Sequence, residues 1–150
     1  MAEVLFYHLT ESRFEEALPD LLERSLSRGW RVVVQCTTEE RRNSLDQHLW
    51  TFREDSFLPH GTDEASNGAL QPILLTIDAT QKANDPQVRF MVEGAVPGSL
   101  EGLARGVYLF DGHDEAQLAG ARERWKAEKA AGHAVTYWQQ TEDRRWVKKA

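Results

Sequence analysis

The sequence predicts one α/β domain with a mostly parallel sheet flanked by helices. Short β-branched runs such as residues 31–36 lack polar–apolar alternation, which indicates strands covered on both faces. These runs are separated along the chain by segments with helical spacing, an order that favours right-handed crossovers between parallel strands. No repeat or linker divides residues 1–150, so we expect a single domain with its own core.

The chain begins with a strand and a helix. Residues 3–9 are rich in apolar and aromatic side chains and predict the first strand. Apolar residues at three-and-four spacing then predict a helix that is capped by Thr10 or Ser12 and ended by Gly29. Proline disfavours the interior of a helix, so Pro19 indicates either a kink in this helix or a later start of it.

A second strand and helix follow, and then a loop. Residues 31–36 predict the buried strand, and Thr37 or Thr38 caps a helix that reaches about Trp50. The polar, glycine-bounded segment 61–68 is expected to be an exposed loop.

The second half of the chain continues the same alternation. In order, we expect a strand at 73–77, a turn at 84–86, a strand or short helix at 88–92, a strand at 107–110, a helix over 114–131 closed by Gly132, a strand at 134–140 and a basic tail at 144–150.

Charge is unevenly distributed along the chain. The formal net charge is −6, which disfavours tight binding of nucleic acid by the domain as a whole. From residue 121 to residue 150 there are eight basic and four acidic side chains, so this segment carries +4 and the first 120 residues carry −10. The C-terminal segment can therefore attract an acidic partner that the remainder repels.

Several classes of protein are disfavoured. No apolar run approaches the roughly 20 residues of a membrane span, and the first residues do not resemble a signal peptide. A single cysteine excludes an internal disulfide, which is in keeping with a reducing cytoplasm. Glycine-rich phosphate loops and a nucleophile elbow are missing from the sequence, so no cofactor is expected.

Cys36 is the best candidate for a catalytic nucleophile, because it ends a buried strand and precedes a helix N-terminus. The alternative is a small apolar core residue, which is the commoner role of a free cysteine. The five histidines form no local pair of metal ligands, and the segment Asp111-Gly-His-Asp114 is better explained as a turn and a helix cap.

Several ordered stretches resemble the chi subunit of bacterial DNA polymerase III. The more specific ones are Leu-Asp-x-x-Leu-Trp at 45–50, Ser-Phe-x-Pro-His at 56–60 and Ala-Arg-Glu-Arg-x-Lys at 121–126. The resemblance extends over nearly the whole chain. It implies a Rossmann-like fold without enzymatic activity, membership of the clamp-loader assembly through the psi subunit, and binding of the acidic C-terminal tail of single-stranded-DNA-binding protein, which ends in phenylalanine.

The resemblance makes Arg122 the clamp for the terminal carboxylate of that tail, with Trp125 and Lys126 beside it. Physically the segment suits this role, because Arg122 and Lys126 are four residues apart and share one helical face. A guanidinium can form two parallel hydrogen bonds to a carboxylate, and an aromatic ring can wall a pocket for phenylalanine. The alternative is a solvated helix face with Trp125 in the core.

The resemblance assigns Trp50 and Phe57 to the psi interface, where a helicase-type partner is expected to compete. Large aromatic residues are frequent at the centre of protein interfaces. The alternative is that both rings fill the core. A third functional class remains open: the basic segment with Trp146 can contact single-stranded nucleic acid by stacking.

Overall fold

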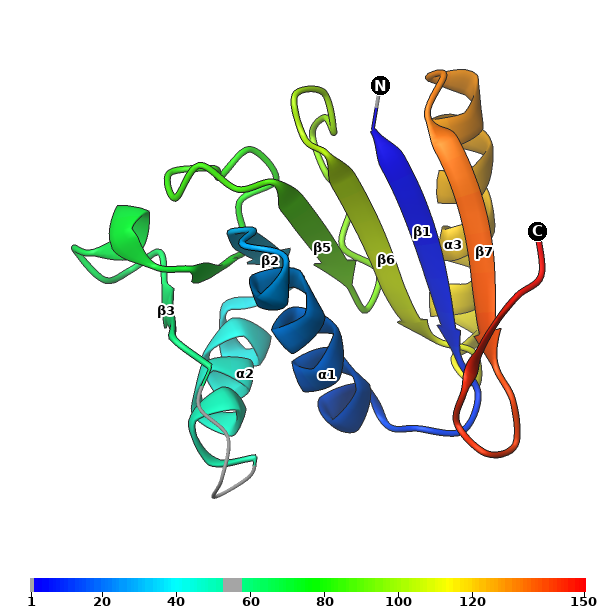
Figure 1. The fold of residues 1–150 in the computed structure, drawn as a ribbon, viewed down its shortest axis with the longest axis horizontal. Coiled ribbons are helices and arrows are strands. Elements are labelled where there is room, and N and C mark those ends of the chain that lie inside the picture. The colour runs from blue at the N-terminus through cyan, green and yellow to red at the C-terminus, as the bar shows by residue number, and fades with distance from the viewer. Residues whose placement is uncertain (1, 53–57) are drawn as a thin grey trace.

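A computed structural model describes residues 2–52 and 58–150. Figure 1 shows that helices pack around a central sheet. The strands are β1 (Glu3–Leu9), β2 (Val32–Gln35), β3 (His60–Thr62), β4 (Ile73–Thr76), β5 (Val88–Val92), β6 (Arg105–Asp111), β7 (Ala134–Gln140) and β8 (Trp146–Lys148). The helices are α1 (Phe14–Ser27), α2 (Glu39–Thr51), α3 (Glu115–Ala130) and the short 3-10 helix η1 (Gly68–Leu70).

Within the described residues, the strands form one sheet in the order β3-β4-β2-β5-β6-β1-β7-β8. Every neighbouring pair is parallel except β7 and β8, which are antiparallel. The expected α/β class with a mostly parallel sheet is therefore confirmed. Strands β2, β4 and β5 are buried along their whole length, including the polar Gln35 of β2 and the charged Arg89 of β5.

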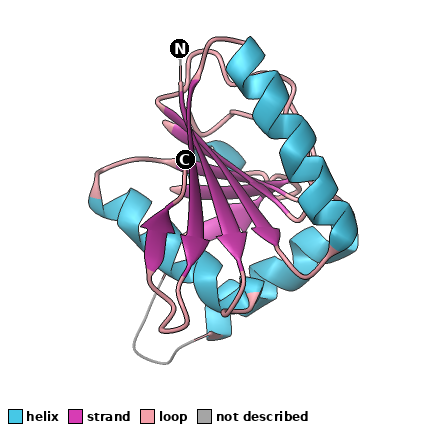
Figure 2. Ribbon diagram, turned by 90° about the vertical axis from the view of Figure 1, so that its right-hand side faces the viewer, coloured by secondary structure: helices cyan, strands magenta, loops and turns pink. Residues whose placement is uncertain are grey.

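Helices cover both faces of the sheet. Helices α1 and α2 lie on one face and α3 lies on the other (Figures 1 and 2). Because side chains alternate along a strand, β1 contributes to two separate cores: Leu9 packs in the core beneath α1 and α2, whereas Phe6 packs in the core beneath α3. The face beneath α1 is only partly covered, and Figure 1 shows β1 and β7 without a helix on that side.

Most expected elements are confirmed. Residues 88–92 form a strand, since this fully buried segment pairs with β2 on one side and β6 on the other. Thr38 caps α2 by accepting a hydrogen bond from the backbone N–H of Arg41, and Asp114 caps α3 in the same way. Gly29 and Gly132 follow helix ends with φ angles of 78° and 88°, the left-handed conformation that glycine adopts without strain.

The expected cap of the first helix was wrong. Helix α1 begins at Phe14, and Arg13 precedes it without a side-chain cap. The side-chain oxygen of Gln140 accepts hydrogen bonds from the backbone N–H groups of Thr10 and Ser12, and its Nε2 donates to the Ser12 hydroxyl. These bonds to β7 hold the segment as a loop.

Two segments expected to lack regular structure contain short edge strands. Residues 60–62 form β3 beside β4, so the loop expected at 61–68 is shorter than predicted. Residues 146–148 of the expected basic tail form β8, which pairs with β7. Both strands have three residues, too few for a hydrophobic period to be visible. Within the described residues, no helix is long and apolar enough to cross a bilayer.

Candidate functional site

A shallow hollow of about 650 Å³ lies between α3 and β7. Helix α3 turns Ala121 and Glu128 toward the sheet, which leaves Arg122 and Lys126 exposed on its outer side. The hollow is lined by Ala119, Arg122, Glu123, Trp125, Lys126, Tyr137 and Ala150. The structure therefore brings together the three residues that the sequence placed at one site.

Arg122 presents an available positive charge. Its exposed guanidinium makes no hydrogen bond or ion pair with any part of the chain that the structure describes. Burial lowers the pKa of the nearby His8 imidazole, and His113 and Arg122 lower it further by charge repulsion. The unpaired Arg122 leaves this end of the hollow suited to an anion.

Trp125 belongs to both the core and the hollow. Its half-buried ring meets Phe6 edge-on at a centroid distance of 5.5 Å and Tyr137 at 5.8 Å. The Nζ of Lys129 lies 5.3 Å from its ring centroid. The two alternatives for Trp125 are thus not exclusive, because one edge of the indole packs inward while the ring also lines the hollow.

Lys126 lies at the rim and is only weakly engaged. Its Nζ is 3.9 Å from the carboxylate of Glu123, and both side chains are about three-quarters exposed. Such a surface pair contributes about 0–1 kcal/mol, so Lys126 can exchange partners readily.

Tyr137 is a lining residue that the sequence did not single out. Its hydroxyl lies 2.8 Å from Nδ1 of His8, and its ring is 6.5 Å from that of Phe6. Burial raises the pKa of Tyr137, so its hydroxyl stays neutral. The alternation of β7 was a usable signal, since Val135 and Tyr137 must share a face and Trp138 must point to the other.

The second candidate surface is described only in part. Phe57 lies outside the described residues. Trp50 is 47% exposed at the end of α2, so it does not fill the core. Its ring lies 4.2 Å, centroid to centroid, from that of buried His60. The His60 imidazole is fixed in turn by the backbone carbonyls of Leu58 and Asp46, at 2.6 and 2.9 Å.

Cys36 lacks the setting of a nucleophile. It is buried in the core, and burial raises the pKa of its thiol to about 12, with a smaller contribution from Glu93. The reactive thiolate is therefore scarce at neutral pH. Arg41 lies on the helix that follows and is bonded to Glu15 and Glu93 at 2.8 and 2.6 Å.

The segment 111–114 serves the turn before α3. Asp111 accepts a hydrogen bond from the backbone N–H of His113, and Asp114 accepts one from that of Gln117. Among residues 2–52 and 58–150, no group of three or more potential metal ligands is found.

Comparison with known proteins identifies the family of the chain. The sequence model of the family described as DNA polymerase III chi subunit, HolC, matches residues 1–136. The chain belongs to this family. The DNA polymerase III subunit chi of Pseudomonas aeruginosa is 39% identical over 116 residues, which cover 77% of this chain and 78% of that protein. The probable DNA polymerase III subunit chi of Rickettsia prowazekii is 28% identical over 92 residues, covering 61% of this chain and 55% of that protein.

The resemblance to the chi subunit is thus confirmed. Trp50, Arg122, Trp125 and Lys126 all lie inside the range matched to the chi family. Two other lining residues of the hollow, Tyr137 and Ala150, follow the range matched to the chi family.

Proposed function

We propose that this member of the chi family is a non-catalytic, cytoplasmic adaptor of the clamp-loader assembly of DNA polymerase III. In this proposal the hollow beside α3 binds the acidic C-terminal tail of single-stranded-DNA-binding protein. The surface around Trp50 and Phe57 binds the psi subunit and, in competition with it, a helicase-type partner. The adaptor acts by binding alone.

The observation that carries the proposal is the unpaired guanidinium of Arg122 beside an aromatic hollow. In a chain that ends in phenylalanine, the last residue carries both a free carboxylate and an aromatic ring. Arg122 can hold the carboxylate through two parallel hydrogen bonds, and the rings of Trp125 and Tyr137 can contact the phenylalanine. Lys126 can attract acidic residues farther along the tail.

The psi side is supported by the exposure of Trp50. An aromatic ring that is 47% exposed while resting on a fixed imidazole costs little conformational entropy to bury against a partner. Interfaces of this kind concentrate their binding energy in a few such rings.

The tail proposal is tested by fluorescence anisotropy of a labelled acidic peptide that ends in phenylalanine. Arg122→Ala is expected to weaken binding at least about tenfold, because a charge-assisted pair contributes about 1.5–3 kcal/mol. Amidating the peptide's C-terminus should weaken binding to the wild type to a similar degree and have little further effect on Arg122→Ala. The exposed Arg145, which lies outside the hollow, provides the control Arg145→Ala.

Equal affinity of wild type and Arg122→Ala for the free-acid peptide would contradict the clamp. Additive effects of amidation and of Arg122→Ala would place the carboxylate elsewhere, since only groups in contact show strong coupling.

A further inference from the structure

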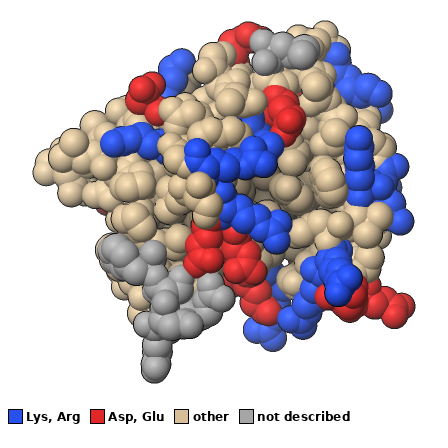
Figure 3. Space-filling view, in the orientation of Figure 1, with Lys and Arg blue, Asp and Glu red and all other residues tan. Residues whose placement is uncertain are grey.

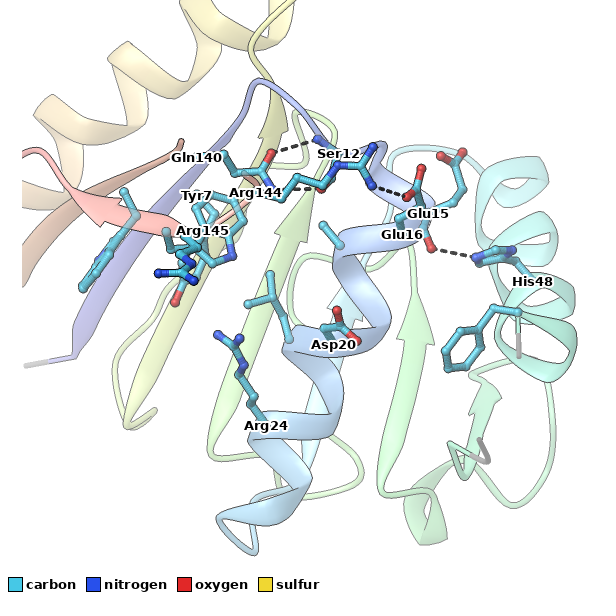
Figure 4. Close-up of a pocket in the computed structure, with 15 residues that line it drawn as sticks. Tyr7, Ser12, Glu15, Glu16, Asp20, Arg24, His48, Gln140, Arg144 and Arg145 are labelled. Atoms are coloured by element: carbon cyan, nitrogen blue, oxygen red, sulfur yellow. Dashed lines mark hydrogen bonds and ion pairs between the residues drawn. The ribbon is translucent and has the colours of Figure 1, made fainter. Parts of the chain in front are cut away.

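A second hollow lies on the opposite face of the sheet, between α1 and the β7–β8 hairpin. It consists of a cavity of about 740 Å³ (Figure 4) and an adjoining depression of about 130 Å³, which share Tyr7, Leu21 and Arg24 as lining residues. We call this surface the arginine trough and define it by Tyr7, Arg24, Arg28, Arg105, Trp138 and Trp146.

Three arginines converge on one end of the trough. Arg24 lies in the last turn of α1 and Arg28 directly follows the helix, and neither side chain makes a hydrogen bond or ion pair within the described part of the chain. Arg105 comes from β6 and pairs with Glu3 at 2.6 Å, while its buried Nε has no hydrogen-bond partner among the described residues. Burial raises the pKa of the Tyr7 hydroxyl, and among the charges near it the three arginines lower that pKa while Glu3 raises it.

Trp30 brings two of these like charges together. The guanidinium carbons of Arg28 and Arg105 lie 5.0 and 5.1 Å from the centroid of its ring. Two cations at one ring repel each other, and an anion between or beside them relieves that repulsion. Figure 3 shows this face, where Lys and Arg side chains gather near the centre and along the right edge.

Aromatic rings line the other end of the trough. Trp138 on β7 and Trp146 on β8 are both half-buried. The ring of Tyr7 lies 4.7 Å from that of Trp146 and 6.4 Å from that of Trp138. Among the described elements, no helix lies over β7 on this side of the sheet (Figure 1), and both tryptophans line the larger cavity of the trough.

Acidic side chains are concentrated along one flank of the trough. Glu15, Glu16 and Asp20 project from the N-terminal half of α1 (Figure 4). Glu15 is paired with Arg41 on α2, and Glu16 is paired with Arg144 of the hairpin at 3.4 Å. An anionic ligand is therefore directed away from this flank and toward Arg24 and the uncovered sheet.

We propose that the arginine trough binds single-stranded nucleic acid, with Arg24, Arg28 and Arg105 on phosphates and the rings of Trp138 and Trp146 stacked on bases. A positively charged groove for the phosphates and aromatic rings for the bases are the two features that a single strand requires. The carboxylates of an acidic peptide can pair with the arginines, but such a peptide has no aromatic base in each repeating unit to stack on the tryptophans. The net charge of −6 makes this binding weak and sensitive to salt.

The test is anisotropy of a labelled oligothymidylate of about 12 nucleotides, titrated with the full chain from about 50 mM salt upward. Three arginine–phosphate contacts predict a slope of about −2 in log affinity against log salt, at about −0.7 per contact. Arg24→Glu should weaken binding about tenfold or more and make the slope shallower by about one contact. Trp146→Ala should weaken binding at an unchanged slope, because stacking releases no counterions.

Lys82→Glu supplies the matched control, since Lys82 is exposed, lies outside the trough and undergoes the same change of charge. Equal weakening by Lys82→Glu and Arg24→Glu would overturn the proposal by showing a general charge effect. Equal competition by a polyglutamate peptide of matched charge would overturn it in favour of a simple anion site. Urea unfolding of Arg24→Glu and Trp146→Ala separates loss of binding from loss of folding.

The trough and the hollow beside α3 are separable in the same experiments. Arg24→Glu should still bind the acidic tail peptide, and Arg122→Ala should still bind the oligothymidylate, because the two sites lie on opposite faces of the sheet (Figure 2). A negative result at one site therefore does not contradict the proposal for the other site.

Discussion

The imidazole Nε2 of His48 donates a 2.8 Å hydrogen bond to the backbone carbonyl of Glu15. That carbonyl would normally accept a bond from the N–H four residues later, where α1 has Pro19, which has no N–H. Helix α2 thus supplies the donor that α1 lacks. The Glu15 carboxylate is bonded to α2 as well, through Arg41 at 2.8 Å.

We therefore expect His48→Ala to lower the free energy of unfolding by about 1–2 kcal/mol, because a part-buried carbonyl loses its donor. In a Pro19→Ala background the loss should be clearly smaller, since residue 19 then provides an N–H within α1. Urea unfolding of the four variants measures this coupling as a double-mutant cycle. The exposed neighbour Gln47→Ala serves as control, and an identical loss in both backgrounds would contradict the pairing.

Trp125 is predicted to support both folding and tail binding. Trp125→Ala removes the contacts with Phe6 and Tyr137 and should cost about 2–3 kcal/mol of stability, below the range for a fully buried Trp. Trp125→Phe keeps an aromatic edge and should cost less than about 1.5 kcal/mol, with peptide affinity largely retained. Urea unfolding and peptide anisotropy check the two effects. A stable Trp125→Ala that binds like the wild type would contradict both roles.

The thiol of Cys36 should be unreactive in the native state. Burial raises its pKa to about 12 from an ordinary value of 9.0. The unfolded chain therefore ionises first as pH rises, and stability falls between about pH 9 and pH 12. Cys36→Ala should show a shallower alkaline loss in urea titrations. The buried Tyr108, whose pKa is also raised to about 12, should account for part of the remaining loss.

A thiol reagent added at pH 8 supplies the direct measurement for Cys36. Labelling should wait for unfolding and should accelerate in urea in step with the unfolding transition. Rapid labelling of the folded chain would instead support Cys36 as a reactive nucleophile.

Trp50 is predicted to matter for a partner and little for folding. Because its ring is 47% exposed, Trp50→Ala should change stability by less than about 1 kcal/mol. The same change should weaken psi binding at least about tenfold, the effect expected of an interface hot spot. Its buried neighbour Leu49 gives the contrast: Leu49→Ala should cost about 2–5 kcal/mol. Calorimetric titration with psi measures the binding, and unchanged affinity for Trp50→Ala would count against this surface.

The expected order of strands and helices was largely confirmed, because a buried element has a recognisable local pattern of apolar residues. Residues 32–34 and 73–76 are apolar or β-branched, since both faces of a central parallel strand are covered. The edge strands at 60–62 and 146–148 were missed, because each owes its conformation to hydrogen bonds with one neighbouring strand. Their own side chains show no period.

The sequence by itself determined the fold class and one half of the candidate site. Arg122 and Lys126 share a helical face by spacing alone, which follows from the local geometry of any α-helix. Only the tertiary structure decided that Tyr137 faces them, and that Tyr7, Arg24 and Arg105 meet on the other side of the sheet. Tyr7 and Arg105 become neighbours through the pairing of β1 with β6, which depends on backbone hydrogen bonds between segments more than 90 residues apart. Arg24 and Tyr137 join their sites because α1 packs on β6 and α3 packs on β7.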